Sequence, residues 1–428
     1  METNELYSYF LQCTGIATDT RKITSGSLFF ALKGDNFDAN SFAEEALQKG
    51  AKYVVIDNPQ YKSGDTTLLV NNSLEALQDL ARHHRRELGV PVIALTGSNG
   101  KTTSKELINA VLSKKYTTTA TIGNLNNHIG VPLTLLSLTK DTEIGIVEMG
   151  ANHQQEISFL CSVAEPNFGY ITNFGKAHLE GFGGYEGVIK GKSELYDYLI
   201  NNTKTAFVNL DDPIQKEKTA TSSRYTFAVD DYNCDVRIET VKANPMVTVK
   251  YNGSDIKSHL IGIYNATNIS AAIAIGTYFK ISDTHIKEAI EGYIPTNNRS
   301  QLLEKNSYKI ILDAYNANPS SMQAALTNFL QLETEDAIKI AVLGDMFELG
   351  VESIEEHKKI VALLTDQEGI EVYFVGKDFY ACKNNSIHLH FYNTYEDFKS
   401  AFPIPEHGTT LLIKGSRGMA LERTLDLL

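Results

Sequence analysis

One stretch constrains the fold of this chain more than any other: residues 89–105 read GVPVIALTGSNGKTTSK. The apolar, β-branched run at 92–95 is typical of a strand buried on both faces, and a helical pattern follows over about 105–112. Between them lies a tight glycine loop that ends in Gly-Lys-Thr-Thr. A strand, a glycine loop and a helix N-terminus in this order predict a phosphate-binding loop that holds ATP or GTP.

This loop offers two kinds of group to a nucleotide. Its backbone N–H groups can surround a polyphosphate, Lys101 can reach the β- and γ-phosphates, and the Thr102 hydroxyl can bind Mg²⁺. The predicted nucleotide-binding residues of the loop are Gly97, Ser98, Asn99, Gly100, Lys101, Thr102 and Thr103.

The composition limits the possible partners. A net charge of −13 argues against a nucleic-acid partner or an anionic membrane surface. The four cysteines are scattered without a CxxC pair, which favours reduced thiols. The N-terminus is too polar for a signal peptide, and no apolar run approaches the roughly 20 residues that span a bilayer. We therefore expect a soluble, cytoplasmic protein that is a monomer.

Alternating apolar strands and helices predict an α/β protein of three domains, at residues 1–84, 85–296 and 297–428. The middle domain should hold a mainly parallel sheet wound by right-handed crossovers, with helices on both faces. The alternating segments between residues 224 and 260 predict antiparallel strands inserted at one edge. We place the hinge before the last domain in the polar stretch 297–300.

Two further candidate residues stand at the ends of predicted strands. Glu148 closes the strand in IVEMG, and His178 follows YITN. Ligands of parallel sheets collect at the carboxyl ends of the strands. On residue type alone, His178 is an unusual magnesium ligand, and an ordinary core or surface histidine is the alternative.

Ten motifs follow one another along the chain. They are TGSNGKTT, GNLNNHIGVP (123–132), VEMGAN (147–152), ITNFGKAHLEGFG (171–183), GKSEL (191–195), YNATN (264–268), NNRSQ (297–301), DAYNANPSSM (313–322), LGDMFELG (343–350) and IKGSRGMALE (413–422). Their set and order resemble the Mur ligases of peptidoglycan synthesis over nearly the whole chain. The resemblance implies an ATP-dependent ligase that joins D-Ala-D-Ala to UDP-N-acetylmuramoyl-tripeptide through an acyl phosphate and a tetrahedral intermediate.

The resemblance also implies how the domains share this work. A small N-terminal α/β domain would bind the UDP-sugar, and the central domain would bind ATP. A Rossmann-like C-terminal domain would bind the incoming dipeptide and close on ATP. Asn268 would contact adenine, Asp313 the ribose and Arg299 a phosphate, although a hinge salt bridge is the alternative for Arg299.

Two Mg²⁺ ions are implied by the same resemblance, with four ligands from the chain: Thr102, Glu148, His178 and Lys192. Lys192 would be carbamylated by CO₂, which replaces an ammonium by an anion that can approach Mg²⁺. Lys190 lies two residues earlier, so either lysine could carry the carbamate. The implied catalytic residues are Lys101, Glu148, His178 and Lys192.

Substrate contacts are implied in three groups. Those near the UDP-sugar are Asp19, Thr20, Arg21 and Ser25; those near the acceptor peptide are Asn124, Asn126 and Asn127; and those toward the dipeptide are Tyr315, Asn316, Asn318, Lys414 and Ser416. Amide and hydroxyl groups suit peptide recognition because they supply donors and acceptors. A surface turn with one ion pair explains Asp19-Thr20-Arg21 equally well.

Three other functions compete with this one. A sister ligase or a folylpolyglutamate-type synthetase would add a single amino acid, but the motifs GNLNN and DAYNANP argue against both. A nucleotide-gated binding protein would keep the phosphate loop without the chemistry. This last alternative is disfavoured by the joint presence of Lys101, Glu148, His178 and Lys192, since nucleotide binding alone needs no second group of metal ligands.

Overall fold

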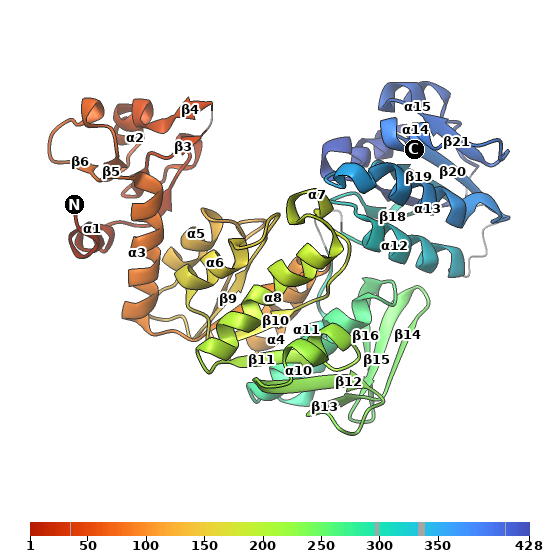
Figure 1. Cartoon of the computed structure of the whole chain (residues 1–428), viewed down its shortest axis with the longest axis horizontal. Helices are drawn as coiled ribbons and strands as arrows, with labels where there is room; N and C mark the ends of the chain where they lie inside the picture. Colours follow the sequence, from red (N-terminus) through yellow and green to blue (C-terminus); the bar gives the residue numbers. More distant parts are fainter. Residues whose placement is uncertain (35, 296–298, 333–338, 407) are drawn as a thin grey trace.

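The computed structural model describes residues 1–428 except 35, 296–298, 333–338 and 407. Three main sheets follow one another along the chain, each in its own α/β unit (Figure 1). The predicted domain boundary at residues 296 and 297 and half of the predicted hinge lie outside the described residues. Within the described residues, no helix combines the length and the apolar character needed to cross a membrane.

The N-terminal sheet is parallel and four-stranded, in the order β1 (Ile16–Ala17), β2 (Leu28–Phe30), β5 (Tyr53–Ile56) and β6 (Thr67–Leu69). A short hairpin of β3 (Lys33–Gly34) and β4 (Phe37–Asp38) stands beside it. The helical elements are α1 (Thr3–Phe10), η1 (Thr20–Lys22), η2 (Ala39–Phe42), α2 (Ala43–Gln48) and η3 (Pro59–Tyr61). The long helix α3 (Ser73–Leu88) connects this unit to the next, so the predicted boundary at residue 84 falls inside a helix.

The central sheet has seven parallel strands, and the strand before the phosphate-binding loop, β7, lies in its interior between β10 and β9. The order is β13 (Val236–Ile238), β12 (Ser223–Val229), β11 (Thr205–Asn209), β10 (Phe168–Ile171), β7 (Val92–Thr96), β9 (Ile144–Glu148) and β8 (Thr118–Ala120). Val92 and Ala94 pack into the core on one face, and Ile93 and Leu95 into the core on the other. The predicted strand buried on both faces is therefore confirmed.

Helices cover both faces of this sheet. α5 (Gly130–Leu136), α6 (Glu156–Ala164) and α8 (Tyr185–Asn201) pack on one face, and α4 (Lys101–Leu112) and α10 (Asn265–Tyr278) on the other. Further helices are α7 (Leu179–Phe182), α9 (Pro213–Lys218) and α11 (Asp283–Glu291). The helix expected from about residue 105 starts at Lys101, because Gly100 (φ 78°) turns the loop directly into it.

One prediction about the edge of this sheet was wrong. Residues 224–260 were expected to form antiparallel strands, but β12 and β13 run parallel and extend the central sheet. Only β14 (Thr240–Ala243), β15 (Met246–Tyr251) and β16 (Ser254–Ile261) pair antiparallel. β13, at the sheet edge, has the alternating burial that an antiparallel strand also shows, whereas β12 beside it buries Thr226, Phe227 and Ala228 in succession.

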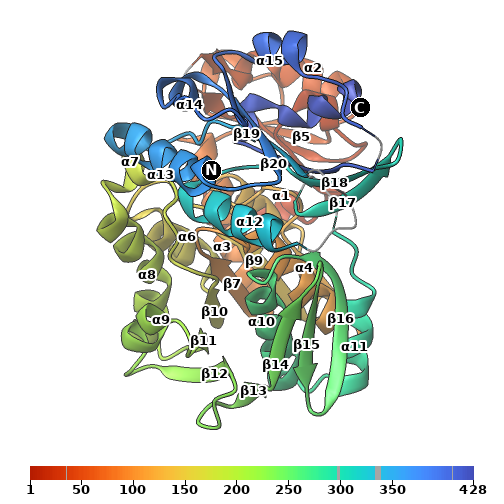
Figure 2. The ribbon, with the colours of Figure 1, turned by 90° about the vertical axis from the view of Figure 1, so that its right-hand side faces the viewer.

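The C-terminal sheet has the order β17 (Gln301–Lys305), β18 (Tyr308–Asp313), β22 (Thr410–Lys414), β19 (Lys339–Gly344), β20 (Ile370–Val375) and β21 (Leu389–Tyr392). Only β17 runs antiparallel to its neighbour. The helical elements of the C-terminal unit are α12 (Pro319–Gln331), η4 (Gly350–Glu352), α13 (Ser353–Thr365), α14 (Lys377–Ala381), α15 (Tyr395–Ala401), η5 (Arg417–Met419) and η6 (Leu421–Leu427). Figure 2 shows α12 on the side of this sheet that faces the central unit.

Candidate active site

A cavity of about 1430 Å³ lies where the carboxyl ends of the central strands face those of the C-terminal strands. On the central side its lining includes the phosphate-binding loop after β7, Glu148 at the end of β9, and His178 beyond β10. On the C-terminal side it includes Asp313 at the end of β18 and Lys414 at the end of β22. Both sheets thus place predicted site residues at the edge where parallel sheets bind ligands.

The phosphate-binding loop is hydrogen-bonded to the segment that directly follows the neighbouring strand β10. The Thr172 hydroxyl donates to the carbonyl of Asn99 at 2.5 Å, and the N–H of Ser98 donates to the carbonyl of Asn173 at 3.1 Å. Gly97 has a φ of 138°, and a Cβ there would collide with the Thr172 hydroxyl. Only glycine permits this close approach of the loop to that segment.

The start of α4 is built to receive an anion. Gly100 is the N-cap and provides no side-chain bond to the first N–H groups of the helix. Such uncapped N–H groups bind phosphates, with the helix dipole adding to the attraction. Lys101 folds over the loop and donates to the carbonyl of Gly97 at 2.7 Å. Burial, with the charge of Arg299, lowers the pKa of Lys101 from its ordinary value.

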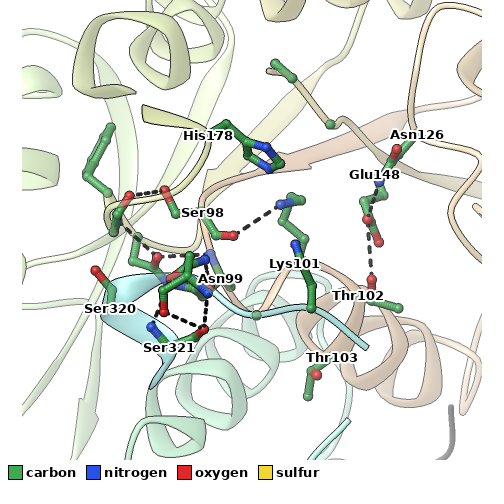
Figure 3. Close-up of a pocket in the computed structure, with 18 of the residues that line it drawn as sticks. Ser98, Asn99, Lys101, Thr102, Thr103, Asn126, Glu148, His178, Ser320 and Ser321 are labelled. Carbon is green, nitrogen blue, oxygen red and sulfur yellow. Dashed lines mark hydrogen bonds between the residues drawn. The ribbon is translucent and has the colours of Figure 1, made fainter. Parts of the chain in front are cut away.

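Glu148 faces this helix start (Figure 3). Its Oε1 accepts hydrogen bonds from Asn126 Nδ2 at 2.8 Å and from the Thr102 hydroxyl at 3.4 Å. Its Oε2 is buried and has no hydrogen-bond partner within the described residues. A buried carboxylate oxygen without a donor is costly unless a cation meets it, so the geometry fits a divalent ion.

His178 points into the same cavity from the segment after β10 (Figure 3). Its Nδ1 is hydrogen-bonded to Glu348, which belongs to the C-terminal unit. The structure therefore brings Lys101, Thr102, Glu148 and His178 to one cavity. No group of three or more His, Cys, Asp or Glu side chains gathers as a metal site anywhere in the described part of the chain. The roles of these four residues stay predictions.

Lys192, on α8, is only 1% exposed and is not among the residues that line the cavity. Its Nζ donates to the carbonyl of Ala151 at 3.0 Å and stands 4.8 Å from the centre of the Phe182 ring. Burial, with the nearby charge of Lys101, lowers the pKa of Lys192 well below its ordinary value. Lys190, the other candidate for carbamylation, is exposed.

The residues predicted to contact the nucleotide beyond the phosphate-binding loop come from two units. Asn268 Nδ2 donates to Asn265 Oδ1 at 2.8 Å, while its Oδ1 accepts from the Ser104 hydroxyl at 3.0 Å. Asp313 is held by Lys414, whose Nζ donates to it at 2.5 Å. The Arg299 guanidinium stacks 3.6 Å from the centre of the Tyr315 ring. Asn268, Arg299 and Asp313 all line the cavity.

The residues predicted to contact substrates divide into those inside and those outside the cavity. The ones that line it are Asn124, Asn126, Asn127, Tyr315, Asn316, Asn318 and Lys414. Ser416 does not line it, because it is buried and its hydroxyl accepts from the N–H of Phe347 at 2.9 Å. Asp19, Thr20, Arg21 and Ser25 lie in the N-terminal unit, away from the lining residues. There Arg21 pairs with Asp19 at 2.7 Å in an exposed turn.

Sequence reasoning missed the residues that join the two units at this site. The Lys176 ammonium donates to Glu356 at 2.7 Å, and the backbone N–H of Lys176 donates to the Ser320 hydroxyl at 2.8 Å. Glu348 contacts His178. Lys176, Ser320 and Glu348 fall within three of the quoted motifs, but no motif tells which of its residues meets which. The sequence did not reveal which motifs lie next to each other in the folded protein.

Comparison with known proteins decides the family. Three family models match in order: "Mur ligase family, catalytic domain" over residues 12–85, "Mur ligase middle domain" over 95–276, and "Mur ligase, glutamate ligase domain" over 298–417. A UDP-N-acetylmuramoyl-tripeptide–D-alanyl-D-alanine ligase of Bacillus subtilis is 35% identical over 95% of this chain and 91% of its own length. The chain belongs to the Mur ligase family.

Solved structures agree with this membership in the Mur ligases. A MurF crystal structure from Acinetobacter baumannii matches with a TM-score of 0.87 and 30% identity, over 99% of this chain and 97% of the other. A MurF ligase of Thermotoga maritima, solved in complex with ADP, matches with a TM-score of 0.83 and 26% identity, over 98% and 97%. The three-domain Mur ligase fold expected from the motifs is therefore confirmed.

Proposed function

We propose that this Mur ligase joins D-Ala-D-Ala to UDP-N-acetylmuramoyl-tripeptide in an ATP-dependent reaction of peptidoglycan precursor synthesis that releases ADP and phosphate. The observation that carries the proposal is the single cavity shared by the phosphate-binding loop and the polar strand ends of the C-terminal unit. Its volume of about 1430 Å³ exceeds the roughly 300–1,000 Å³ typical of one small ligand. The B. subtilis relative is named for this reaction.

The chemistry explains why the two units must share one cavity. A carboxylate and an amine do not condense in water, so the γ-phosphoryl group of ATP is first transferred to the carboxylate. The amine attacks the resulting acyl phosphate, and phosphate leaves from the tetrahedral intermediate. Lys101 and the first N–H groups of α4 would stabilise the charge on the transferring oxygens. Arg299, Asp313 and Asn268 would hold the phosphate, ribose and adenine.

Two Mg²⁺ ions would be bound by Thr102, Glu148, His178 and the carbamate of Lys192. The unpartnered, buried Oε2 of Glu148 supports a cation at this place. When bound, the ions would neutralise the triphosphate beside the acceptor carboxylate.

Carbamylation of Lys192 is supported by its environment. A pKa lowered by burial favours the neutral amine, and the lone pair of a neutral Nζ can attack the carbon of CO₂ with loss of one proton. The product is an anion of the kind that magnesium prefers. Lys190 is exposed and has no such environment, so we assign the modification to Lys192.

The substrates would lie on different walls of the cavity. Asn124, Asn126 and Asn127 would contact the acceptor peptide, and Tyr315, Asn316, Asn318 and Lys414 the dipeptide. Ser416 would contribute to dipeptide binding indirectly, because its hydroxyl holds the loop that contains Phe347. The UDP-sugar would reach the exposed turn formed by Asp19, Thr20, Arg21 and Ser25.

The test is phosphate release from ATP by the purified protein with the UDP-N-acetylmuramoyl-tripeptide. We expect release that depends on added D-Ala-D-Ala. Turnover with a single amino acid in its place would favour a sister ligase. If the protein binds ATP but releases no phosphate with either D-Ala-D-Ala or a single amino acid, it is a binding protein and not a ligase.

A further inference from the structure

A loop of the C-terminal unit, residues 345–348, crosses to the segment that carries His178. Glu348 Oε2 accepts a hydrogen bond from His178 Nδ1, although the two residues are 170 positions apart in the sequence. The carbonyl of Glu348 also accepts from the N–H of Glu180 at 3.2 Å. Glu348 therefore contacts the His178 segment with both its side chain and its main chain.

Successive residues of this loop are each fixed by groups of their own unit. The N–H groups of Asp378 and Phe379 donate to the Asp345 carboxylate at 3.1 and 3.0 Å, the N–H of Met346 to His357 Nε2 at 3.0 Å, and the N–H of Phe347 to the Ser416 hydroxyl at 2.9 Å. Asp345, His357 and Ser416 are all buried. The loop is thus a rigid support rather than a loose connection.

Both partners of the contact have an unusual backbone. His178 has a φ of 53° and Glu348 a φ of 62°, values that residues other than glycine rarely adopt. Such conformations persist only where the surrounding structure imposes them, and they cluster at functional sites. The surrounding fold therefore imposes on His178 and Glu348 a backbone conformation that neither residue favours by itself.

The contact determines which nitrogen of His178 is free. A bond from Nδ1–H to a carboxylate occupies Nδ1, so Nε2 is the ring nitrogen left to meet another group. Within the described residues, Nε2 has no hydrogen-bond partner, and the ring lines the cavity beside Lys101 (Figure 3). Glu348 is half exposed and is not among the lining residues, so it reaches the cavity only through His178.

We propose that Glu348 is a positioning residue, which holds His178 in the orientation that presents Nε2 to a divalent cation at the phosphate-binding loop. His178 and Glu348 belong to different units, so the cation site is complete only when the C-terminal unit is docked. The inference rests on the proposed function, in which His178 binds a metal.

The test uses Mn²⁺ with ADP as the probe and the whole protein. In the wild type, pulsed EPR should detect nitrogen coupling from a histidine bound to Mn²⁺. Glu348→Ala should weaken Mn²⁺ affinity by about 10-fold or more and reduce this coupling. Glu348→Gln should lie between, because its amide oxygen can still accept from Nδ1. Glu355→Gln removes an exposed carboxylate from nearby α13 and should change neither readout.

A double variant separates positioning from a merely structural role. If Glu348 acts through His178, then Glu348→Ala should add nothing to the affinity loss of His178→Ala. An additive loss, or unchanged coupling and affinity in Glu348→Ala, would overturn the proposal. Absence of histidine coupling in the wild type would also overturn it. Phosphate release that depends on D-Ala-D-Ala in the same preparation would then leave the proposed function standing.

Discussion

Asn99 of the phosphate-binding loop and Asn318 at the start of α12 are hydrogen-bonded to each other across two units. Asn318 Nδ2 donates to Asn99 Oδ1 at 2.7 Å, while Asn318 Oδ1 accepts from the N–H of Ser321 at 2.9 Å. One amide thus caps a helix of the C-terminal unit and contacts the loop of the central unit. The position of α12 is thereby coupled directly to the place where phosphates would bind.

Replacing Asn318 should affect both of these roles. We expect Asn318→Ala to lower the free energy of unfolding by about 1 kcal/mol, the typical loss for a helix cap, and to reduce ligase turnover several-fold. Ser321→Ala is the matched control, since it leaves the contact between Asn318 and Asn99 in place and removes the hydroxyl that accepts from the N–H of Asn318 and donates to its carbonyl. Urea unfolding and phosphate release measure the two effects. Equal turnover in both variants would contradict a role for the contact with Asn99.

Loss of the loop lysine should remove catalysis. We expect Lys101→Ala to lower phosphate release by about 10²–10³-fold or more, because a preorganised charge at the transferring phosphoryl group is lost. Lys114→Ala is the control: this lysine lies just beyond α4 and pairs with Glu288 at 3.1 Å on the surface. Near-full activity of Lys101→Ala would refute the assignment of the loop.

Carbamylation can be observed directly. After exposure to isotopically labelled CO₂, the carbamate carbon should give an NMR signal in the wild type and in Lys190→Ala, but none in Lys192→Ala. Turnover of Lys192→Ala should fall and recover in part when small carboxylates are added, because they can replace the missing anion. A signal that disappears with Lys190 would transfer the modification to that residue.

Docking of the C-terminal unit should weaken in acid. Burial alone would raise the pKa of Glu356, but hydrogen bonds from Lys176 and Lys359 outweigh it and hold this pKa below its ordinary value of about 4.3. Because the pKa is lower in the folded state, the stabilisation is present above about pH 4.3 and is lost as the pH falls through the folded pKa.

Glu356→Gln tests this pH dependence. At pH 7 it should cost about 1–2 kcal/mol of unfolding free energy, since two charged hydrogen bonds are weakened. Below the folded pKa the variant and the wild type should converge, because protonated Glu356 resembles glutamine. The exposed Glu355→Gln should match the wild type at both pH values. A gap between Glu356→Gln and the wild type that persists in acid would argue against ionised Glu356.

Local sequence patterns were sufficient to predict the elements that carry the central unit's part of the site. The phosphate-binding loop, the strand before it and the strand-end position of Glu148 follow from short apolar runs and glycine spacing. The cavity lining contains residues from most of the quoted motifs. Strand direction at the sheet edge could not be obtained in this way, because the sequences of β12 and β13 alternate as those of antiparallel strands do.

The sequence by itself determined that a strand, a loop and a helix form a phosphate site, because these elements depend on neighbours a few residues apart. Only the tertiary structure decided that Glu348 meets His178, that Asn318 meets Asn99, and that Ser416 supports a loop. These pairs are far apart in the chain, and hydrogen bonding across such separations depends on how whole units pack rather than on any local pattern.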